Sequence, residues 1–417
     1  MNRSQARRRA AVTGIGVVAP NGVGTDQYWK ATCEGTSVLA PIDREGCEQS
    51  PLRIAGLIKG FDAAQFVEER ILVATDRFTH YALAAAGLAL ADSELPVDAE
   101  RDADDPFGIG VVTAAGSGGG EFGQGELQQL WSQGPHHVGP YQSIAWFYAA
   151  STGQISIRGG FKGPCGVVAS DEAGGLDALA HAARDVVRGT TAVVVGAAEA
   201  PIAPYSMVCQ LGYPELSTAT DAKRAYLPFT EQASGFAPAE GGAFFVLEDE
   251  ATARARGARI RAVLAGHGAT FTGASRWAES RDGLAHAMRG ALAEANCAPE
   301  EVDVVFADAL AVPDADRAEA LALADVLGKH AARVPVTAPK AGIGRAYCGG
   351  SALDTASAAL CLEQGLIPPT PNVSGCAYDL DLVTGFARAA APRTALVLSR
   401  GLMGSNSAVL LRLGSES

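Results

Sequence analysis

Short apolar runs alternate with longer stretches rich in alanine and leucine along this chain, and this alternation most constrains its fold. The apolar runs have the length of buried strands and cover residues 10–13, 108–113, 191–196, 242–248, 302–307 and 394–399. The longer stretches have helical periodicity and cover residues 76–93, 173–188, 280–295, 316–327 and 351–364. Strands that alternate with helices predict a largely parallel or mixed sheet covered by helices, an α/β fold.

The length of the chain predicts two core units or a duplicated fold, because 417 residues exceed the usual single domain about twofold. A weak internal sequence repeat indicates duplication. Residues 191–196 precede a second strand at 242–248, and residues 394–399 precede another at 407–413. The charged stretch 250–259 is the best candidate junction. We therefore expect one half over residues 1–255 and a similar half over residues 256–417.

Charge and cysteine content exclude several classes of protein. The net charge of −13 argues against nucleic acid or an anionic membrane as partner. No apolar run approaches the roughly 20 residues that span a bilayer. The eight cysteines are scattered, with no C-x-x-C pair and no histidine at zinc spacing. We expect a cytoplasmic protein with reduced thiols, no bound metal and no cofactor.

Residues 163–178 have the pattern of a strand, a tight turn and a helix start, and the turn contains Glu172. This segment resembles the active-site strand, turn and helix of β-ketoacyl synthases. In that family a cysteine nucleophile stands three residues before a Gly-Leu-Asp tripeptide, which here is Gly175-Leu176-Asp177. Glu172 occupies the nucleophile position. A carboxylate cannot replace a thiolate as an acyl carrier at useful rates.

The resemblance to β-ketoacyl synthases extends along the whole chain. It includes the opening strand at 12–20 and the central segments 224–230 and 239–243. Within the superfamily the chain is most similar to chain length factors, the β-subunits of type II polyketide ketosynthases, through segments 145–149, 152–158, 304–308 and 312–313. The resemblance implies a thiolase-like, five-layered αβαβα fold with two similar halves, each containing a mixed sheet.

The catalytic positions of the family are all substituted in this chain. An active ketosynthase uses a cysteine and two histidines, and the corresponding residues here are Glu172, Asp308 and Arg345, whereas the family lysine is retained as Lys340. The resemblance therefore implies a non-condensing β-subunit of a heterodimeric acyltransferase. Such a subunit pairs with an active ketosynthase α-subunit, meets the acyl carrier protein through the heterodimer, encloses the growing polyketide chain and sets its length.

Two other functions remain open for such a chain. One is decarboxylation of malonyl-carrier protein for chain initiation, a role assigned to the glutamine that chain length factors usually carry where this chain has Glu172. An ionised Glu172 has only acceptors and would repel the malonyl carboxylate, and a helix N-terminus favours that anion. We expect instead that Glu172 and Asp308 face Lys340 and Arg345 in a mutually neutralised cluster. The other open function is that of a β-subunit in a polyene-type system.

The glycine-rich stretch 116–123 lacks the residues of a phosphate-binding loop. By resemblance it belongs to a helical segment that reaches the subunit interface and lines the polyketide tunnel. The positions carried over are Gly120, Gly123 and Leu127, with Trp146 as a further wall residue. Since two of these positions have no side chain, the sequence predicts a deep tunnel and a product longer than an octaketide.

Two further motifs have simpler interpretations. Cys165 lies on the strand before the turn, and we expect it to be a buried, inert packing residue rather than a nucleophile. His136 and His137 are adjacent in sequence, a poor arrangement for binding one metal ion, so we expect an exposed loop pair.

Overall fold

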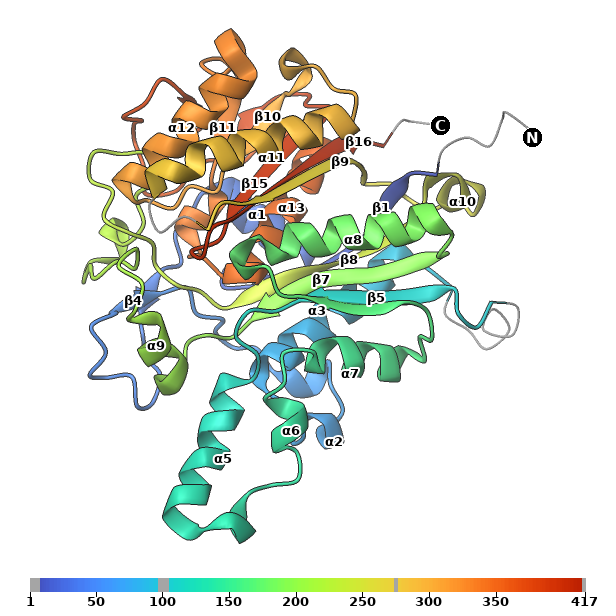
Figure 1. The fold of residues 1–417 in the computed structure, drawn as a ribbon, viewed down its shortest axis with the longest axis vertical. Coiled ribbons are helices and arrows are strands. Elements are labelled where there is room, and N and C mark those ends of the chain that lie inside the picture. The colour runs from blue at the N-terminus through green and yellow to red at the C-terminus, as the bar shows by residue number, and fades with distance from the viewer. Residues whose placement is uncertain (1–7, 97–104, 274–276, 415–417) are drawn as a thin grey trace.

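The computed structural model describes residues 8–96, 105–273 and 277–414, and one twisted mixed sheet crosses the whole molecule (Figure 1). Its strand order is β13-β11-β10-β15-β16-β9-β1-β8-β7-β5-β6, with β2 (Gly22–Val23) paired to β1. The other strands of this sheet are β1 (Ala10–Ala19), β5 (Ile109–Ala114), β6 (Cys165–Val168), β7 (Ala192–Glu199), β8 (Gly241–Asp249), β9 (Ala262–Phe271), β10 (Val304–Phe306), β11 (Pro335–Thr337), β13 (Asp381–Leu382), β15 (Thr394–Arg400) and β16 (Ser405–Leu413).

The two ends of this sheet repeat one pattern of strand directions. In the first half β5 is parallel to β6 and β7, and β7 and β1 are antiparallel to β8. In the second half β10 is parallel to β11 and β15, and β15 and β9 are antiparallel to β16. The sequence repeat corresponds to the pairs β7–β8 and β15–β16. The halves join where β1 pairs with β9.

Helices form three layers around the two halves of the sheet (Figure 1). The outer helices α3 (Arg77–Ser93) and α7 (Ala150–Gly159) cover the first half, and α11 (Ser280–Glu294) and α12 (Pro313–Leu327) cover the second. Between the halves lie α8 (Gly174–Arg188) and α13 (Tyr347–Gln364). All five predicted helices and the five-layered α/β architecture are confirmed.

The middle layer is the most deeply buried part of the fold. Leu176 of α8 and Leu353 of α13 share one apolar core with Val195 of the first half and Val397 of the second. Helix α13 is buried around almost its whole circumference, as expected for a helix enclosed between two sheets. This layer carries the start of α8, and therefore Glu172, into the centre of the molecule.

Small residues allow helices and strands to approach closely, which explains the high glycine and alanine content. A Cβ atom at Gly14 of β1 would lie 2.1 Å from the Ala89 carbonyl oxygen of α3, and one at Gly16 would lie 2.0 Å from that of Ala85. Both distances are shorter than a van der Waals contact, so these two positions require glycine at this helix–sheet spacing.

An arm of short helices extends from the body of the molecule at the lower edge of Figure 1. It consists of α5 (Gly120–Gln133), the turn Pro135–His137 and α6 (Gln142–Ala145). The remaining elements are α1 (Thr25–Glu34), α2 (Glu69–Leu72), α9 (Pro204–Gln210), α10 (Glu250–Ala255), β3 (Ala40–Pro41), β4 (Ile54–Ala55), β12 (Leu366–Ile367) and β14 (Arg388–Ala389). In the described part of the chain, no helix is long and apolar enough to cross a membrane.

Helix α10 ends at the predicted division after residue 255, between the last strand of the first half and the first strand of the second. The division into two units stays a prediction, because the halves share one hydrogen-bonded sheet through β1 and β9.

Candidate functional site

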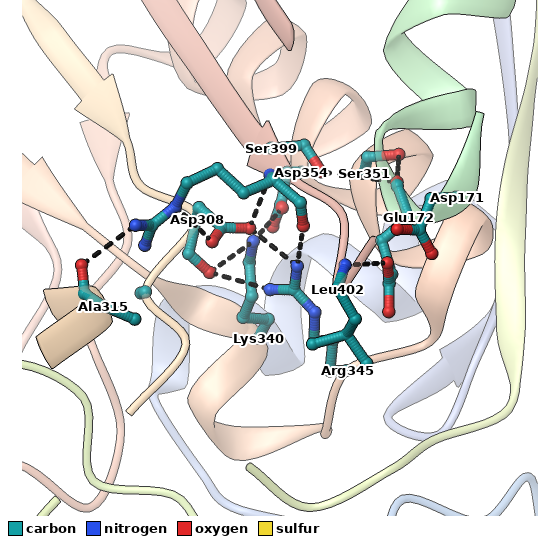
Figure 2. Close-up of polar contacts among 12 residues, drawn as sticks. Asp171, Glu172, Asp308, Ala315, Lys340, Arg345, Ser351, Asp354, Ser399 and Leu402 are labelled. Atoms are coloured by element: carbon teal, nitrogen blue, oxygen red, sulfur yellow. Dashed lines mark hydrogen bonds and ion pairs between the residues drawn. The ribbon is translucent and has the colours of Figure 1, made fainter. Parts of the chain in front are cut away.

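The three substituted positions lie in the centre of the molecule, each just after or just before a regular element. Glu172 lies in a single 3-10 turn, Asp171–Ala173, that leads into α8. Asp308 follows β10, and Arg345 precedes α13. All three side chains are buried. We refer to these three residues as the substituted centre (Figure 2).

Asp308 is the hub of the charged side of this centre. Its Oδ1 accepts a hydrogen bond of 2.8 Å from Arg345 Nη2, and its Oδ2 accepts one of 2.9 Å from Arg400 Nε. Arg345 also donates to the carbonyl oxygens of Asp308 and Arg400. The positions of the two family histidines are therefore occupied by an ion pair, and both terminal nitrogens of Arg345 already donate to oxygen atoms.

Two more acids complete the ion-pair network. Arg400 is fully buried and its Nη2 donates to Glu319 Oε2 at 2.9 Å. Lys340 forms an ion pair with Asp354 of α13, and its Nζ donates to the Asp308 carbonyl oxygen at 3.2 Å. Buried charges persist only when each has a partner. We refer to Asp308, Glu319, Lys340, Arg345, Asp354 and Arg400 as the ion-pair network.

The expectation that Glu172 belongs to this network is wrong. Its Oε2 accepts the N–H of Leu402 at 2.9 Å, and no ion pair joins it to Lys340 or Arg345 within the described residues. Figure 2 shows Glu172 on the far side of the Arg345 side chain from Asp308. Lys340 faces Asp354 instead, which is why the four charges do not form one neutral cluster.

The two acids of the substituted centre have opposite protonation preferences. Burial would raise the pKa of Asp308, but the charges of Arg345, Arg400 and Lys340 outweigh it and hold the pKa below its ordinary value. For Glu172, burial and then the adjacent Asp171 raise the pKa well above its ordinary value, and Arg345 and the Leu402 N–H only partly oppose this. Burial and Asp171 therefore act against the ionised form of Glu172 that we expected.

Carboxylates of α12 fix the loop that presents Asp308. Glu319 accepts the backbone N–H groups of Asp308 and Ala309, and Asp316 accepts those of Ala311 and Phe229. The residues Ala309, Ala311 and Phe229 have positive φ, a conformation that side chains disfavour and that these hydrogen bonds maintain.

Sequence reasoning missed Glu319 and Arg400. Glu319 lies on the same buried face of α12 as Ala315, Ala322 and Leu323. An acid at an inward helical position is a signal that a buried cation lies opposite. Arg400 ends a fully buried strand, which is a signal of the same kind.

A cavity of about 400 Å³ lies on the other side of Glu172. We refer to it as the central cavity. Two predicted tunnel residues, Gly120 and Trp146, line it together with Glu172, Glu199 and Cys348. Glu199 accepts the Gly116 N–H and the Ser117 hydroxyl, and these bonds hold the turn before α5 against the end of β7.

The other two predicted tunnel positions lie farther from this cavity. A Cβ atom at Gly123 would lie 3.0 Å from Cδ1 of Trp146, so a side chain there would contact the indole first. Leu127 is one turn farther along α5 and is 43% exposed. For Gly120, an added Cβ would lie 2.5 Å from the Ser206 hydroxyl of α9. The start of α5 is held by Asp76, whose Oδ2 accepts the Phe122 N–H at 2.8 Å.

The expectation of a buried Cys165 is wrong. Cys165 is exposed because its strand, β6, is the edge strand of the sheet. The buried thiol nearest the substituted centre is Cys348, which donates to the Asp171 carbonyl oxygen. Burial raises the pKa of Cys348 well above its ordinary value, so it is not an activated nucleophile.

His136 and His137 are exposed in the arm, as predicted. Over the described ranges, no group of three or more His, Cys, Asp or Glu residues has the arrangement of a metal site.

Two family descriptions match the chain. "Beta-ketoacyl synthase, N-terminal domain" matches residues 7–253, and "Beta-ketoacyl synthase, C-terminal domain" matches residues 261–374. The chain belongs to the β-ketoacyl synthase family. Its substituted centre distinguishes it from the family members that catalyse condensation.

Similar proteins are β-subunits of polyketide synthases. A protein of Streptomyces coelicolor named "Putative polyketide beta-ketoacyl synthase 2" is 70% identical, and the match covers 98% of this chain and 96% of that protein. The tetracenomycin polyketide synthase ketoacyl synthase beta subunit of Streptomyces glaucescens is 49% identical, covering 96% and 97%. The solved ishigamide ketosynthase/chain length factor has a TM-score of 0.88 at 27% identity, covering 98% of this chain and all of that one.

Proposed function

We propose that this chain is the non-condensing β-subunit, or chain length factor, of a type II polyketide synthase. The observation that carries this proposal is the substituted centre, where Asp308 and Arg345 form an ion pair in place of two histidines and Glu172 stands in place of the nucleophile. The terminal nitrogens of Arg345 are already hydrogen-bonded to Asp308 and to the Arg400 carbonyl oxygen, and position 172 offers no thiolate for acyl transfer. The chemistry must then come from an active ketosynthase partner.

An apolar surface supports pairing with that partner. Large exposed apolar side chains occur on the arm, on the segment after it and on α7, between residues 127 and 157, and the nearby strand β6 is an edge strand of the sheet. Trp131 is 83% exposed and Ile157 is 75% exposed. Exposed apolar groups and an unpaired strand edge are features of protein interfaces. We refer to this surface as the partner face; its exposed side chains are Leu127, Trp131, Tyr141, Ile144, Trp146, Phe147, Tyr148 and Ile157.

Control of chain length is the second element of the proposal. Gly120, Gly123, Leu127 and Trp146 would form the wall that limits the growing chain. Positions 120 and 123 carry no side chain that could narrow the wall, and a phenylalanine at either would have to displace Ser206 or Trp146, so we propose a product longer than an octaketide. The carrier protein would deliver malonyl units to the partner within the heterodimer, in the cytoplasm.

One observation favours the second candidate, decarboxylation of malonyl-carrier protein. Burial and Asp171 raise the pKa of Glu172 well above its ordinary value, and a neutral carboxyl carries an O–H donor that an ionised one lacks. That donor could bind a thioester oxygen as negative charge develops. We rank this candidate second because Arg345 is already paired to Asp308 and would not bind the malonyl carboxylate.

Reconstitution separates the two candidates. The purified chain is incubated with malonyl-carrier protein, with and without its cognate ketosynthase, and products are identified by mass spectrometry. The proposal predicts polyketide only when both subunits are present and no acetyl-carrier protein from this chain alone. Acetyl-carrier protein formed by the chain alone would support the decarboxylase. The product mass also distinguishes an aromatic from a polyene system.

A further inference from the structure

A second cavity lies between the two halves of the molecule, at the end of α8 that points away from Glu172. Its volume is about 570 Å³, which is in the range of binding sites for small organic molecules. One wall is the second half of α8, and the other is formed by β9, β16 and the end of α11 (Figure 1). We refer to this cavity as the basic cleft. Different residues line the basic cleft and the central cavity.

The charge of the basic cleft is opposite to that of the whole protein. Its lining contains five arginines and two glutamates, whereas the chain has a net charge of −13. Both glutamates already face donors. Glu250 pairs with Arg9 at 2.6 Å, and Glu294 accepts the His267 N–H at 2.8 Å. The cleft therefore has a local excess of positive charge that attracts anions. Its arginines are Arg8, Arg9, Arg184, Arg188 and Arg412.

Three of these arginines have no acidic partner among the described residues. Arg9 pairs with Glu250, and Arg188 lies 3.8 Å from an oxygen of the Asp185 side chain. The other three come from separate segments, namely the chain before β1, helix α8 and strand β16. A guanidinium group binds phosphate through two parallel N–H donors. Three such groups around one cleft are suited to a ligand with more than one phosphate. They belong to Arg8, Arg184 and Arg412.

Apolar side chains form a floor between the arginines. Ala180 and Ala183 of α8 and Val263 of β9 line the cleft, and each is less than one-tenth exposed. Inorganic phosphate would leave this floor in contact with water. A phosphate ester with an apolar or aromatic body would cover the floor and gain the free energy of burial. The lining therefore favours an organic phosphate over a simple anion.

We propose that the basic cleft binds a nucleotide, with its phosphates at Arg8, Arg184 and Arg412 and its base on the apolar floor. The cleft is about 15 Å along α8 from the end that carries Glu172, given the rise of a helix per residue. This inference does not rest on the proposed function, because the cleft includes neither the substituted centre nor the partner face.

The test is isothermal titration calorimetry on the heterodimer of this chain with its cognate ketosynthase. The probes are ADP, coenzyme A and inorganic pyrophosphate. We expect the tighter of the two nucleotides to bind at least about tenfold more tightly than pyrophosphate, which has no body to cover the floor. Replacing both Arg184 and Arg412 by glutamine should weaken that nucleotide at least about tenfold, since two charged hydrogen-bond donors are lost. Arg289→Gln, an exposed position on α11 outside the cleft, is the matched control and should leave the affinity unchanged.

A second variant separates a shaped site from general attraction by positive charge. Ala183→Leu fills part of the floor without changing any charge, so it should weaken the nucleotide while leaving pyrophosphate binding unchanged. Three results would overturn the proposal. They are equal affinities for pyrophosphate and both nucleotides, an affinity that neither the double arginine variant nor Ala183→Leu lowers, and absence of nucleotide binding at millimolar concentration. If the double variant fails to fold, Ala183→Leu decides between the outcomes.

Discussion

The two sides of the substituted centre have opposite characters. On one side, Asp308, Arg345 and Arg400 fill the space with ion pairs, and both terminal nitrogens of Arg345 are already hydrogen-bonded. On the other side, Glu172 borders an open cavity of about 400 Å³. The charged side is fully buried, whereas the cavity reaches Trp146 at the surface.

This difference shows which part of a condensing centre this chain has kept. The ion-pair network stabilises the loops after β10 and β15, which otherwise would carry buried, strained backbone. If only stability mattered, we would expect larger side chains to fill the cavity. They do not fill it. We infer that one side serves the fold and the other serves the polyketide chain.

The largest expected effect is on the charged side, from Arg400→Met. The substitution leaves Asp308 and Glu319 without their shared cation in a fully buried site. Breaking a buried pair in this way costs about 3–5 kcal/mol. The free energy of unfolding, measured by urea denaturation, should fall by that amount.

A surface ion pair provides the matched control for Arg400→Met. Arg388 pairs with Asp381, and the Arg388 side chain is 40% exposed, so Arg388→Met should cost less than about 1 kcal/mol. Similar losses for the two variants would show that the network is not the structural element described above.

Association with the partner should depend on the partner face. Ile157→Asp places a charge on α7 beside β6, and we expect it to weaken binding of the cognate ketosynthase by about tenfold to a hundredfold. Phe386→Asp changes an equally exposed apolar residue elsewhere and should leave binding unchanged. Both are measured by titration of purified subunits. Unchanged affinity for Ile157→Asp, or a stable monomer that ignores the ketosynthase in gel filtration, contradicts the assigned face.

Product length should depend on the entrance to the cavity. Gly120→Phe and Gly123→Phe should shift products toward shorter chains, the first by entering the cavity beside Ser206 and the second by displacing Trp146. Gly125→Phe is the control, because a side chain at Gly125 meets open space. Leu127→Phe should have the smallest effect on length, since Leu127 does not line the cavity. Unchanged length in both test variants, with intact heterodimer, would remove these residues from the wall.

The last prediction concerns the pH dependence of the free energy of unfolding. Burial raises the pKa of Asp354 to about 6, against the opposing charge of Lys340. Because the unfolded carboxyl ionises near pH 3.8, the unfolded state binds fewer protons between pH 4 and 6, and stability falls as pH rises through that window. Asp354→Asn should remove this contribution, which the difference between pH 3.8 and about 6 limits to about 3 kcal/mol. An identical pH dependence for both proteins would contradict the assignment.

Much of the fold could be predicted because its signals are local. The apolar runs at 191–196 and 394–399 became β7 and β15, and the alanine-rich periodic stretches became helices. The repeat was only faint in sequence, because it resides in strand directions rather than in residue identities. The exposure of Cys165 could not be predicted, since whether a strand lies at an edge depends on the order of the whole sheet.

The positions of the substituted centre could also be predicted, but not their partners. Motif spacing located Glu172, Asp308 and Arg345. It could not show that Arg400, 92 residues after Asp308, donates a hydrogen bond to the Asp308 carboxylate. It also could not show that Lys340 forms an ion pair with Asp354. Nor could it show the protonation preference of Glu172, because desolvation depends on three-dimensional packing.

We propose that this subunit shapes the product without performing the condensation. The most direct test is Glu172→Ala in the reconstituted heterodimer, with assembly checked by gel filtration and products identified by mass spectrometry. We predict that polyketide still forms. Loss of all polyketide from a folded, fully assembled Glu172→Ala heterodimer would contradict the claim and assign chemistry to this residue.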